Sequence, residues 1–303
     1  MSLRVLITGA KGLIGEPLIK LLLSQGNSIH ILSRTPANSN PAVKEFGWDI
    51  ENGSIDERSL EGVDAIIHLA GENIGAKPWT TKRKHTIVSS RTKSLELLFR
   101  AIKGHTHAKV KTLISASAVG YYGDRGDEIL TETSHPGTGF LADTCMQWEH
   151  AADALAALGH RGVKRRTGVV LAREGGALPK IAGPVKSGFG TILGSGKQWM
   201  PWVHLHDAAH AYVHALNNEQ MEGAYNLSSP RPVTNKVFTE TVAAIHRKKI
   251  WLPNVPDLAL RIALGEMKAI VLSSNRTDST KLQDTGFNFK YAFLPEALHD
   301  LYG

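Results

Sequence analysis

The sequence has a single cysteine, Cys145, among its 303 residues. One thiol cannot form a disulfide within the chain, and a zinc site made of cysteines is excluded as well. Also missing are a signal-peptide pattern and any apolar run of the roughly 18 to 20 residues that cross a bilayer. These absences predict a cytoplasmic protein without a membrane partner.

An acidic surplus is lacking too, because 28 Asp and Glu stand against 35 Lys and Arg, which gives a net charge of +7. The basic residues do not gather in one region. Short clusters at 82–84, 164–166 and 247–249 are separated by long neutral stretches, without the interleaved aromatic residues of an RNA-binding surface. We interpret these clusters as solvated faces and expect no nucleic-acid partner.

The first 170 residues alternate short β-branched runs with longer helical patterns, as in βαβ units around a parallel sheet. Strands are predicted at 4–8, 28–33, 45–48, 65–69, 110–115 and 164–171, and helices at 13–23, 81–102 and 141–158. Right-handed crossovers between such elements give a doubly wound α/β fold of the Rossmann type.

The pattern changes after residue 171. A glycine-rich stretch at 175–196 is followed by a short predicted strand at 199–205 and by predicted helices at 206–216, 235–246, 255–264, 266–272 and 294–301. We therefore divide the chain into a nucleotide-binding domain, residues 1–173, and a smaller mixed lobe on the substrate side, residues 174–303. Some elements of this lobe can return to the sheet.

The first predicted strand leads through a glycine triplet into the first predicted helix. Gly9 permits a tight turn, Gly12 lets the backbone approach a pyrophosphate, and Gly15 lets the helix pack closely on the strand. The alternative is a glycine-rich turn without a ligand. The cofactor-binding candidates of this loop are Gly9, Lys11, Gly12, Leu13 and Ile14.

The second predicted strand ends in Ser33 and Arg34. An enzyme that prefers NAD usually has Asp or Glu here, on the adenosine ribose. Arg34 can instead pair with a 2′-phosphate, with the Ser33 hydroxyl as a second donor and Lys11 as a further positive charge. The sequence therefore predicts NADP(H), unless Arg34 is only an exposed cation before a turn.

These residues resemble the atypical, epimerase-like branch of the extended short-chain dehydrogenases/reductases, in the NAD-dependent epimerase/dehydratase superfamily, which carries its own small C-terminal domain. The similarity extends over nearly the whole chain. Beyond the glycine loop it includes residues 64–72, Trp79, Lys84, Ser90, Arg91, residues 115–124, residues 166–171, residues 202–204, Asp207 and residues 286–289.

The resemblance implies further contacts to the cofactor. It places Asp49 near the adenine, although Asp49 can equally be a plain strand-end cap. Arg91 lies in an amphipathic helix, where a charge that faces the sheet needs an anionic partner. Val170 would form a wall beside the nicotinamide, or be simple core. The implied cofactor residues are Ser33, Arg34, Asp49, Leu69, Ala70, Gly71, Glu72, Thr86, Arg91, Ser115 and Val170.

Members of this superfamily that catalyse redox chemistry use a Tyr, a Lys four residues later, and a Ser or Thr. Ser117 fits the hydroxyl position. The Tyr position falls at Phe140 or Leu141 and the Lys position at Thr144 or Cys145, so the pair is absent. Replacement groups that we consider are Tyr121, Tyr122 and Glu72, each of which has an equally simple structural role.

Two other groups of residues suggest ligands weakly. His206, His210 and His214 have helical i, i+4 spacing near His204, but Asp207 more simply caps a helix, so we predict no metal. Phe189, Trp199 and Trp202 can line a substrate pocket or pack between the lobes, and we favour packing.

The sequence thus predicts an NADP(H)-binding, epimerase-like oxidoreductase that transfers a hydride to or from a small molecule. The alternative is a regulator or sensor that binds NADP(H) with little or no turnover. The substrate and the oligomeric state stay open.

Overall fold

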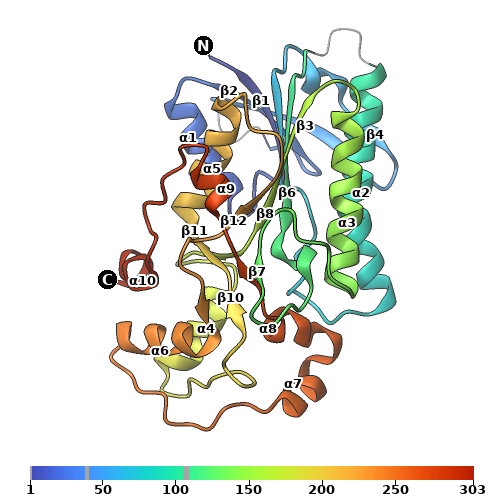
Figure 1. The fold of residues 1–303 in the computed structure, drawn as a ribbon. Helices are drawn as coiled ribbons and strands as arrows, with labels where there is room; N and C mark the ends of the chain where they lie inside the picture. Colours follow the sequence, from blue (N-terminus) through green and yellow to red (C-terminus); the bar gives the residue numbers. More distant parts are fainter. Residues whose placement is uncertain (1, 38–40, 105–108) are drawn as a thin grey trace.

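The computed structural model describes residues 2–37, 41–104 and 109–303, and its centre is one eight-stranded sheet (Figure 1). The strand order is β12-β8-β6-β5-β1-β2-β3-β4, and only the β3–β4 pair is antiparallel. The strands are β1 (Arg4–Thr8), β2 (Ser28–Ser33), β3 (Val43–Asp49), β4 (Ser54–Ile55), β5 (Ala65–His68), β6 (Thr112–Ala118), β8 (Arg161–Thr167) and β12 (Gly223–Leu227).

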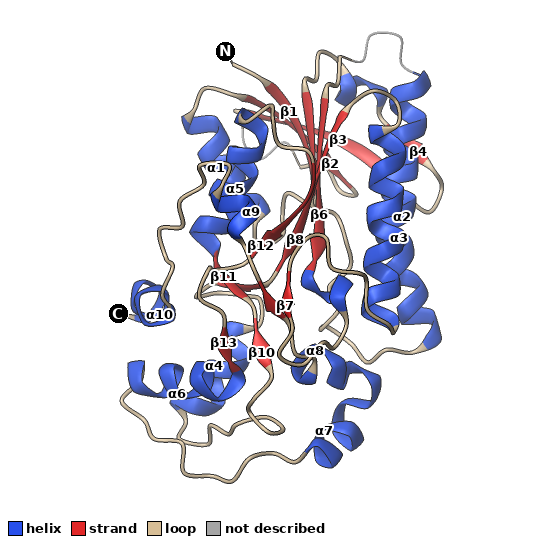
Figure 2. Cartoon of the chain, in the orientation of Figure 1, coloured by secondary structure: helices blue, strands red, loops and turns tan. Residues whose placement is uncertain are grey.

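Helices cover both faces of this sheet (Figure 2). On one face, α1 (Gly15–Ser24) and α5 (Leu205–Asn217) bury their apolar sides on Val5, Ile7 and Ile31. On the other, α2 (Thr81–Gly104) and α3 (Phe140–Ala156) pack on Leu6, Ile66 and Leu113. The fold is therefore the doubly wound Rossmann type that the sequence predicts.

The chain reverses its winding direction between β1 and β5, which are parallel neighbours. In open α/β sheets, ligands bind at the carboxyl ends of the strands at such a point. Here the turn after β1 and the turn after β5 touch, since a Cβ added to Gly9 would lie 2.6 Å from the carbonyl carbon of Leu69.

The remaining elements lie mostly beyond the carboxyl ends of the sheet (Figure 1). Helices α4 (Leu178–Lys186), α6 (Asn235–Ile245) and α10 (Leu294–Tyr302) share a separate apolar core with Trp202 and Phe238. The others are η1 (Glu57–Leu60), η2 (Val119–Tyr122), η3 (Gly265–Lys268), α7 (Asp257–Leu264), α8 (Ala269–Leu272), α9 (Thr280–Gln283), β7 (Ile129–Leu130), β9 (Val169–Leu171), β10 (Trp199–Met200), β11 (Trp202–His204), β13 (Val233–Thr234) and β14 (Arg276–Thr277).

Two elements from beyond residue 173 join the nucleotide-binding layers. β12 is the edge strand of the central sheet, parallel to β8, and α5 packs on the sheet beside α1. The sequence did not predict β12. The division at residue 173 stays a prediction, with these two elements lying across it.

The predicted strand at 164–171 is wrong in its continuity. It forms two strands, because β8 ends at Thr167 and β9 pairs with β11 outside the central sheet. Gly168 lies at the break, where a Cβ would be 2.7 Å from the carbonyl oxygen of Pro201.

Candidate functional site

The glycine loop has the geometry of a phosphate-binding turn. Gly9 has φ +70°, which suits glycine, and a Cβ on Gly15 would lie 2.4 Å from the Ala10 carbonyl oxygen. Gly12 differs from both: it is exposed, and its added Cβ would meet only the Gly9 carbonyl oxygen, at 3.0 Å. Gly9 and Gly15 are thus required by the protein itself, whereas Gly12 leaves its outer side open to a ligand.

The start of α1 has no side-chain cap. Within the described residues, the amides of Leu13 and Ile14 have no hydrogen-bond acceptor, while the amides of Gly12 and Gly15 bond back into the loop at 2.9 and 3.1 Å. Free amides at a helix start bind phosphate oxygens.

The carboxyl end of β2 presents exposed positive charge. The Ser33 hydroxyl, which is buried, accepts the Thr35 amide at 3.2 Å, and no acceptor for its proton is found among the described residues. Lys11 reaches over to the Thr35 carbonyl oxygen at 3.4 Å, and Arg34 is exposed. We name these groups, with Gly9 and Gly12, the nucleotide end.

Glu45, from the neighbouring strand β3, is the acidic group of this region. Its carboxylate accepts the Ala37 amide at 3.1 Å, lies 4.0 Å from the Lys11 ammonium, and is only 6% exposed. It thereby holds the chain that follows Arg34 and does not offer an open carboxylate to a ribose.

Asp49 is engaged as a cap at the end of β3. Its carboxylate accepts the amides of Glu51 and Asn52 at 2.9 and 3.1 Å and the Asn52 side chain at 2.7 Å. These hydrogen bonds lower the pKa of Asp49. The strand-end alternative thus accounts for its side chain, and a contact with adenine stays a prediction.

Arg91, a residue of α2, lies beneath the backbone of Gly71 in the turn after β5. The guanidinium of Arg91 donates to the carbonyl oxygens of Ile87 at 2.7 Å and Glu72 at 3.0 Å, and a Cβ on Gly71 would lie 3.0 Å from its Cζ. The Arg91 Cζ lies 4.9 Å from the centroid of the Trp148 ring, in a cation–π contact. Burial lowers the pKa of Arg91 to about 10, so it stays charged at neutral pH without touching a carboxylate.

The other cofactor-binding candidates near this turn already have partners within the protein. The backbone amide of Leu69 donates a hydrogen bond to the Thr8 carbonyl oxygen, and that of Ala70 donates to the Thr8 hydroxyl oxygen. The Glu72 carboxylate pairs with Arg83 at 2.8 Å. The Thr86 and Ser115 hydroxyls donate to the backbone oxygens of their own segments, and Val170 packs against the core, with its carbonyl oxygen near Gly176.

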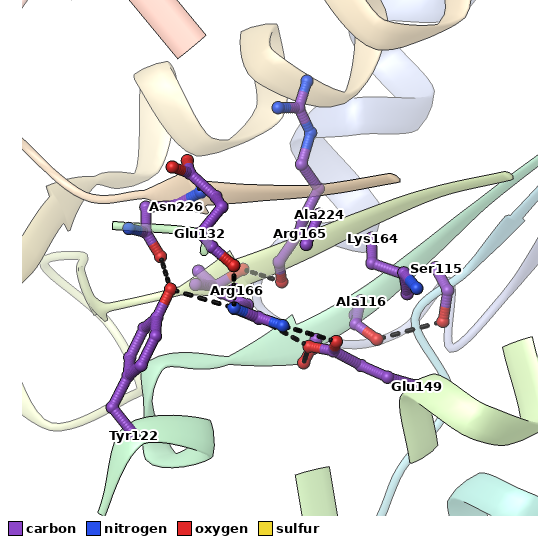
Figure 3. Close-up of polar contacts among 12 residues, drawn as sticks. Ser115, Ala116, Tyr122, Glu132, Glu149, Lys164, Arg165, Arg166, Ala224 and Asn226 are labelled. Carbon is purple, nitrogen blue, oxygen red and sulfur yellow. Dashed lines mark hydrogen bonds and ion pairs between the residues drawn. The ribbon is translucent and has the colours of Figure 1, made fainter. Parts of the chain in front are cut away.

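Beneath the end of β6 lies a set of linked hydrogen bonds, which we name the buried polar network: Ser117, Tyr122, Glu149, Arg166 and Asn226. Figure 3 shows Tyr122, Glu149, Arg166 and Asn226 of this network. Arg166 donates to both carboxylate oxygens of Glu149 at 2.9 Å. Burial lowers the pKa of Arg166, but Glu149 outweighs this effect and raises it.

Ser117 is a donor within this network. Its hydroxyl donates to the Glu149 carboxylate at 2.6 Å, and the same carboxylate accepts from Arg166. The Ser117 proton is therefore used inside the protein, and in this arrangement it does not point to a substrate oxygen.

The two tyrosines differ. Tyr122 is fully buried, donates to Asn226 at 2.7 Å and accepts from Arg166 at 3.0 Å; burial raises its pKa to about 12. Tyr121 is half-buried, and its ring stacks on the Arg166 guanidinium at 3.5 Å. Within the described residues the Tyr121 hydroxyl has no hydrogen-bond partner, so it is the freest phenol near this strand end.

The positions of the missing Tyr-Lys pair are filled by apolar contacts. A Cβ on Gly120 would lie 3.3 Å from Leu141 Cβ and 3.7 Å from the Cys145 sulfur, which places both side chains against η2. Burial raises the pKa of Cys145 to about 12. A neutral, buried thiol is a poor substitute for a lysine.

The histidines of α5 do not form a metal site. Across residues 2–37, 41–104 and 109–303, no three His, Cys, Asp or Glu side chains are placed to hold an ion. His206 and His210 stack at 3.8 Å, and Asp207 accepts the amides of Lys290 and Tyr291. In the same described part of the chain, no helix is both long and apolar enough for a membrane span.

The aromatic residues of the second lobe take separate positions. Trp202 is fully buried in the lobe core, Trp199 donates its indole N–H to Asp127 at 2.7 Å, and Phe189 is 65% exposed. Packing therefore accounts for Trp202, whereas Phe189 does not join it.

Comparison with known proteins identifies the family. The model of the NAD dependent epimerase/dehydratase family matches residues 5–228, and that of a domain of unknown function, DUF1731, matches residues 255–301. The chain therefore belongs to the NAD-dependent epimerase/dehydratase family and carries the DUF1731 domain at its C-terminal end, which confirms the resemblance seen in the sequence.

Particular relatives share its whole length. An epimerase family protein of Staphylococcus saprophyticus is 38% identical over 302 residues, covering 98% of both chains, and the Bacillus subtilis epimerase family protein YfhF is 36% identical over 300 residues, covering 99% of this chain and 98% of its own. The human epimerase family protein SDR39U1 (isoform 2), solved with NADPH, superposes with a TM-score of 0.86 at 29% identity and 99% coverage of each chain.

The sequence interpretation missed the Glu149–Arg166 pair. It took the basic cluster at 164–166 as a solvated face, which is wrong, since Arg165 is fully buried and Arg166 is 4% exposed. The signal for the burial of this cluster was present, because it lies within a predicted strand of the central sheet, where both faces are covered by helices; the partner Glu149 was not predictable from it.

Proposed function

We propose that this protein binds NADP(H) across the carboxyl ends of β1, β2 and β5 and transfers a hydride between the nicotinamide and a small molecule. The family supports a nicotinamide dinucleotide. The choice of NADP(H) over NAD(H) rests on the nucleotide end, where Arg34 and Lys11 are exposed and the Glu45 carboxylate is buried. The NADPH in the human relative agrees with it.

The single observation that carries this proposal is the exposed guanidinium of Arg34, which has no ion-pair partner among the described residues. A 2′-phosphate would give this guanidinium a charge-assisted partner that NADH lacks. Arg91 supplies a second cation, on the nicotinamide side of the site. Its positive charge replaces that of the family's lysine, whose position is occupied by the neutral Cys145.

Titration of NADPH and of NADH onto the protein, followed by the change in nicotinamide fluorescence, tests the proposal. We expect NADPH to bind at least about tenfold more tightly, as one charged hydrogen bond allows. Equal affinities would contradict the selectivity, and failure of both to bind would contradict the site itself.

A second function is favoured by the buried polar network. Ser117 donates to Glu149, Tyr122 is locked with its pKa raised to about 12, and neither Leu141 nor Cys145 offers a transferable proton at neutral pH. A protein of this kind can hold NADP(H) as a sensor or regulator with little turnover.

A panel of carbonyl compounds, monitored for loss of NADPH, separates the two functions. Turnover that Tyr121→Phe lowers about 10²-fold, with NADPH affinity unchanged, would identify Tyr121 as the proton donor. Cys145→Ser is the matched control on the neighbouring helix and should change little. Tight binding with no turnover across the panel favours the sensor.

A further inference from the structure

An ion pair joins the first turns of α2 to the DUF1731 segment beyond the sheet. Lys84 contacts Glu266, a residue of η3 that is 182 positions away in the sequence. The Lys84 side chain is 28% exposed, and its ammonium lies 5.3 Å from the centroid of the Phe140 ring. Phe140 is, with Leu141, one of the two positions where the family resemblance places the proton donor, so this contact lies at or beside that position.

The segment that provides Glu266 is weakly packed. Of the residues in α7, η3 and α8, only Leu260 is buried, and the Glu266 side chain is 63% exposed. Hydrogen bonds hold the segment at its two ends, where Val255 bonds to Ile192 and Gly194 and the Gln198 side chain donates to the Val271 carbonyl oxygen. Between these ends, Lys84 of α2 holds the segment through Glu266, and no other hydrogen bond or ion pair joins α7 or η3 to α2 among the described residues.

The neighbouring ion pair of Arg83 and Glu72 differs from the Lys84–Glu266 pair in its burial and in its number of hydrogen bonds. Arg83, one residue before Lys84, pairs with Glu72 and also donates to the Asn73 carbonyl oxygen at 2.6 Å, all within one connection of the Rossmann sheet. Its side chain is 14% exposed, and that of Glu72 is 33% exposed. The partner of Arg83 is therefore built in, whereas the partner of Lys84 comes from an exposed turn and can be exchanged for another anion.

We propose that Lys84 binds an anionic group of the substrate, a carboxylate or a phosphate, and that Glu266 takes the place of this group when no substrate is bound. The Phe140 ring attracts the ammonium on one side and leaves its other donors for an anion. The inference rests on the proposed function, because it assigns the substrate class for the same NADP(H) site.

The opposite effects of two substitutions test it. Protein saturated with NADPH is titrated with inorganic phosphate and with acetate at constant ionic strength. The readout is the indole N–H resonance of Trp79, whose ring lies 4.8 Å from Phe140; Trp79→Phe assigns it. We expect saturable shifts, about tenfold weaker affinity in Lys84→Gln, and several-fold tighter affinity in Glu266→Gln, because the internal competitor is removed.

Lys82→Gln is the matched control, since Lys82 is an exposed cation of the same turn, and it should change the affinity less than about twofold. Tighter binding of phosphate than of acetate indicates a phosphate ester as the substrate group, and the reverse indicates a carboxylate. A purely structural ion pair would make Glu266→Gln behave like Lys84→Gln or leave both unchanged, and either result overturns the proposal, as does a wild type without a saturable response.

NADPH affinity is measured separately on each variant. Loss of NADPH binding in the wild type would refute the proposed function, whereas intact NADPH binding with no anion response refutes only this inference. Thermal unfolding of each variant, with midpoints near the wild type, shows that the altered affinities do not come from misfolding.

Discussion

The nucleotide end and the buried polar network both lie at carboxyl ends of strands in one sheet, yet their polar groups are used in opposite ways. At the nucleotide end, Arg34 is exposed and the amides of Leu13 and Ile14 are without acceptors in the described chain. In the network, Ser117, Tyr122 and Arg166 have their hydrogen bonds made within the protein.

The difference has a physical consequence. Groups with unmet hydrogen bonds stabilise a ligand, because binding supplies the missing partner. Groups that already have partners stabilise the fold, and a substrate must displace those partners to use them. We therefore expect substitutions at the nucleotide end to change affinity, and substitutions in the network to change stability.

The largest effect should follow from breaking the network at its charged pair. Arg166→Ala leaves Glu149, which is 6% exposed, without its counter-charge and should lower the free energy of unfolding by about 3–5 kcal/mol. Urea denaturation measures it. Lys164→Ala, on the same strand but paired with Asp153, whose side chain is 54% exposed, is the control. Similar losses for both would remove the distinction between the two regions.

At the nucleotide end, Gly12→Val should weaken NADPH binding by about 10²-fold while the protein stays folded. A side chain at Gly12 occupies the approach of the pyrophosphate but meets only the Gly9 carbonyl oxygen within the protein. Gly15→Val is the contrasting variant and should unfold the domain instead. Unchanged NADPH affinity in folded Gly12→Val would make the loop purely structural.

A smaller change should follow from reversing the charge at Arg34. Arg34→Glu should weaken NADPH about 10- to 100-fold through lost attraction and added repulsion, and leave NADH within a few-fold. Its folding stability should equal that of the wild type because Arg34 is exposed. A stability loss comparable to that of Arg166→Ala would contradict the comparison.

At neutral pH the smallest effect concerns His68, which lies between the two regions at the end of β5. Burial, with the nearby Arg91 charge, lowers its pKa to about 3. The unfolded chain binds this proton near pH 6.5, so stability is lost as the pH falls below 6.5, by about 1.4 kcal/mol per pH unit until the pH nears 3. His68→Gln should reduce this slope of unfolding free energy against pH. An unchanged slope would show that His68 is accessible to protons in the folded state.

The sequence alone was sufficient for the fold of the glycine loop. The glycine spacing, the strand before it and the helix after it define a local unit, so its backbone is set by neighbours in the chain. Its binding of a phosphate, and the pairing of Arg34 with a 2′-phosphate at the end of β2, stay predictions. The absence of the Tyr-Lys pair was equally visible, since it depends on position within one helix.

Tertiary structure decided what the other polar side chains do. The sequence made Ser117 a candidate for polarising a substrate oxygen. In the structure its hydroxyl donates to Glu149, 32 positions further along the chain, which pairs with Arg166, 49 positions beyond Ser117. Glu266 reaches Lys84 across 182 positions. Neither pairing has a spacing that a sequence pattern can reveal, because the partners come together only when the sheet and the C-terminal segment pack, and it is that packing which determines whether a side chain is free for a ligand.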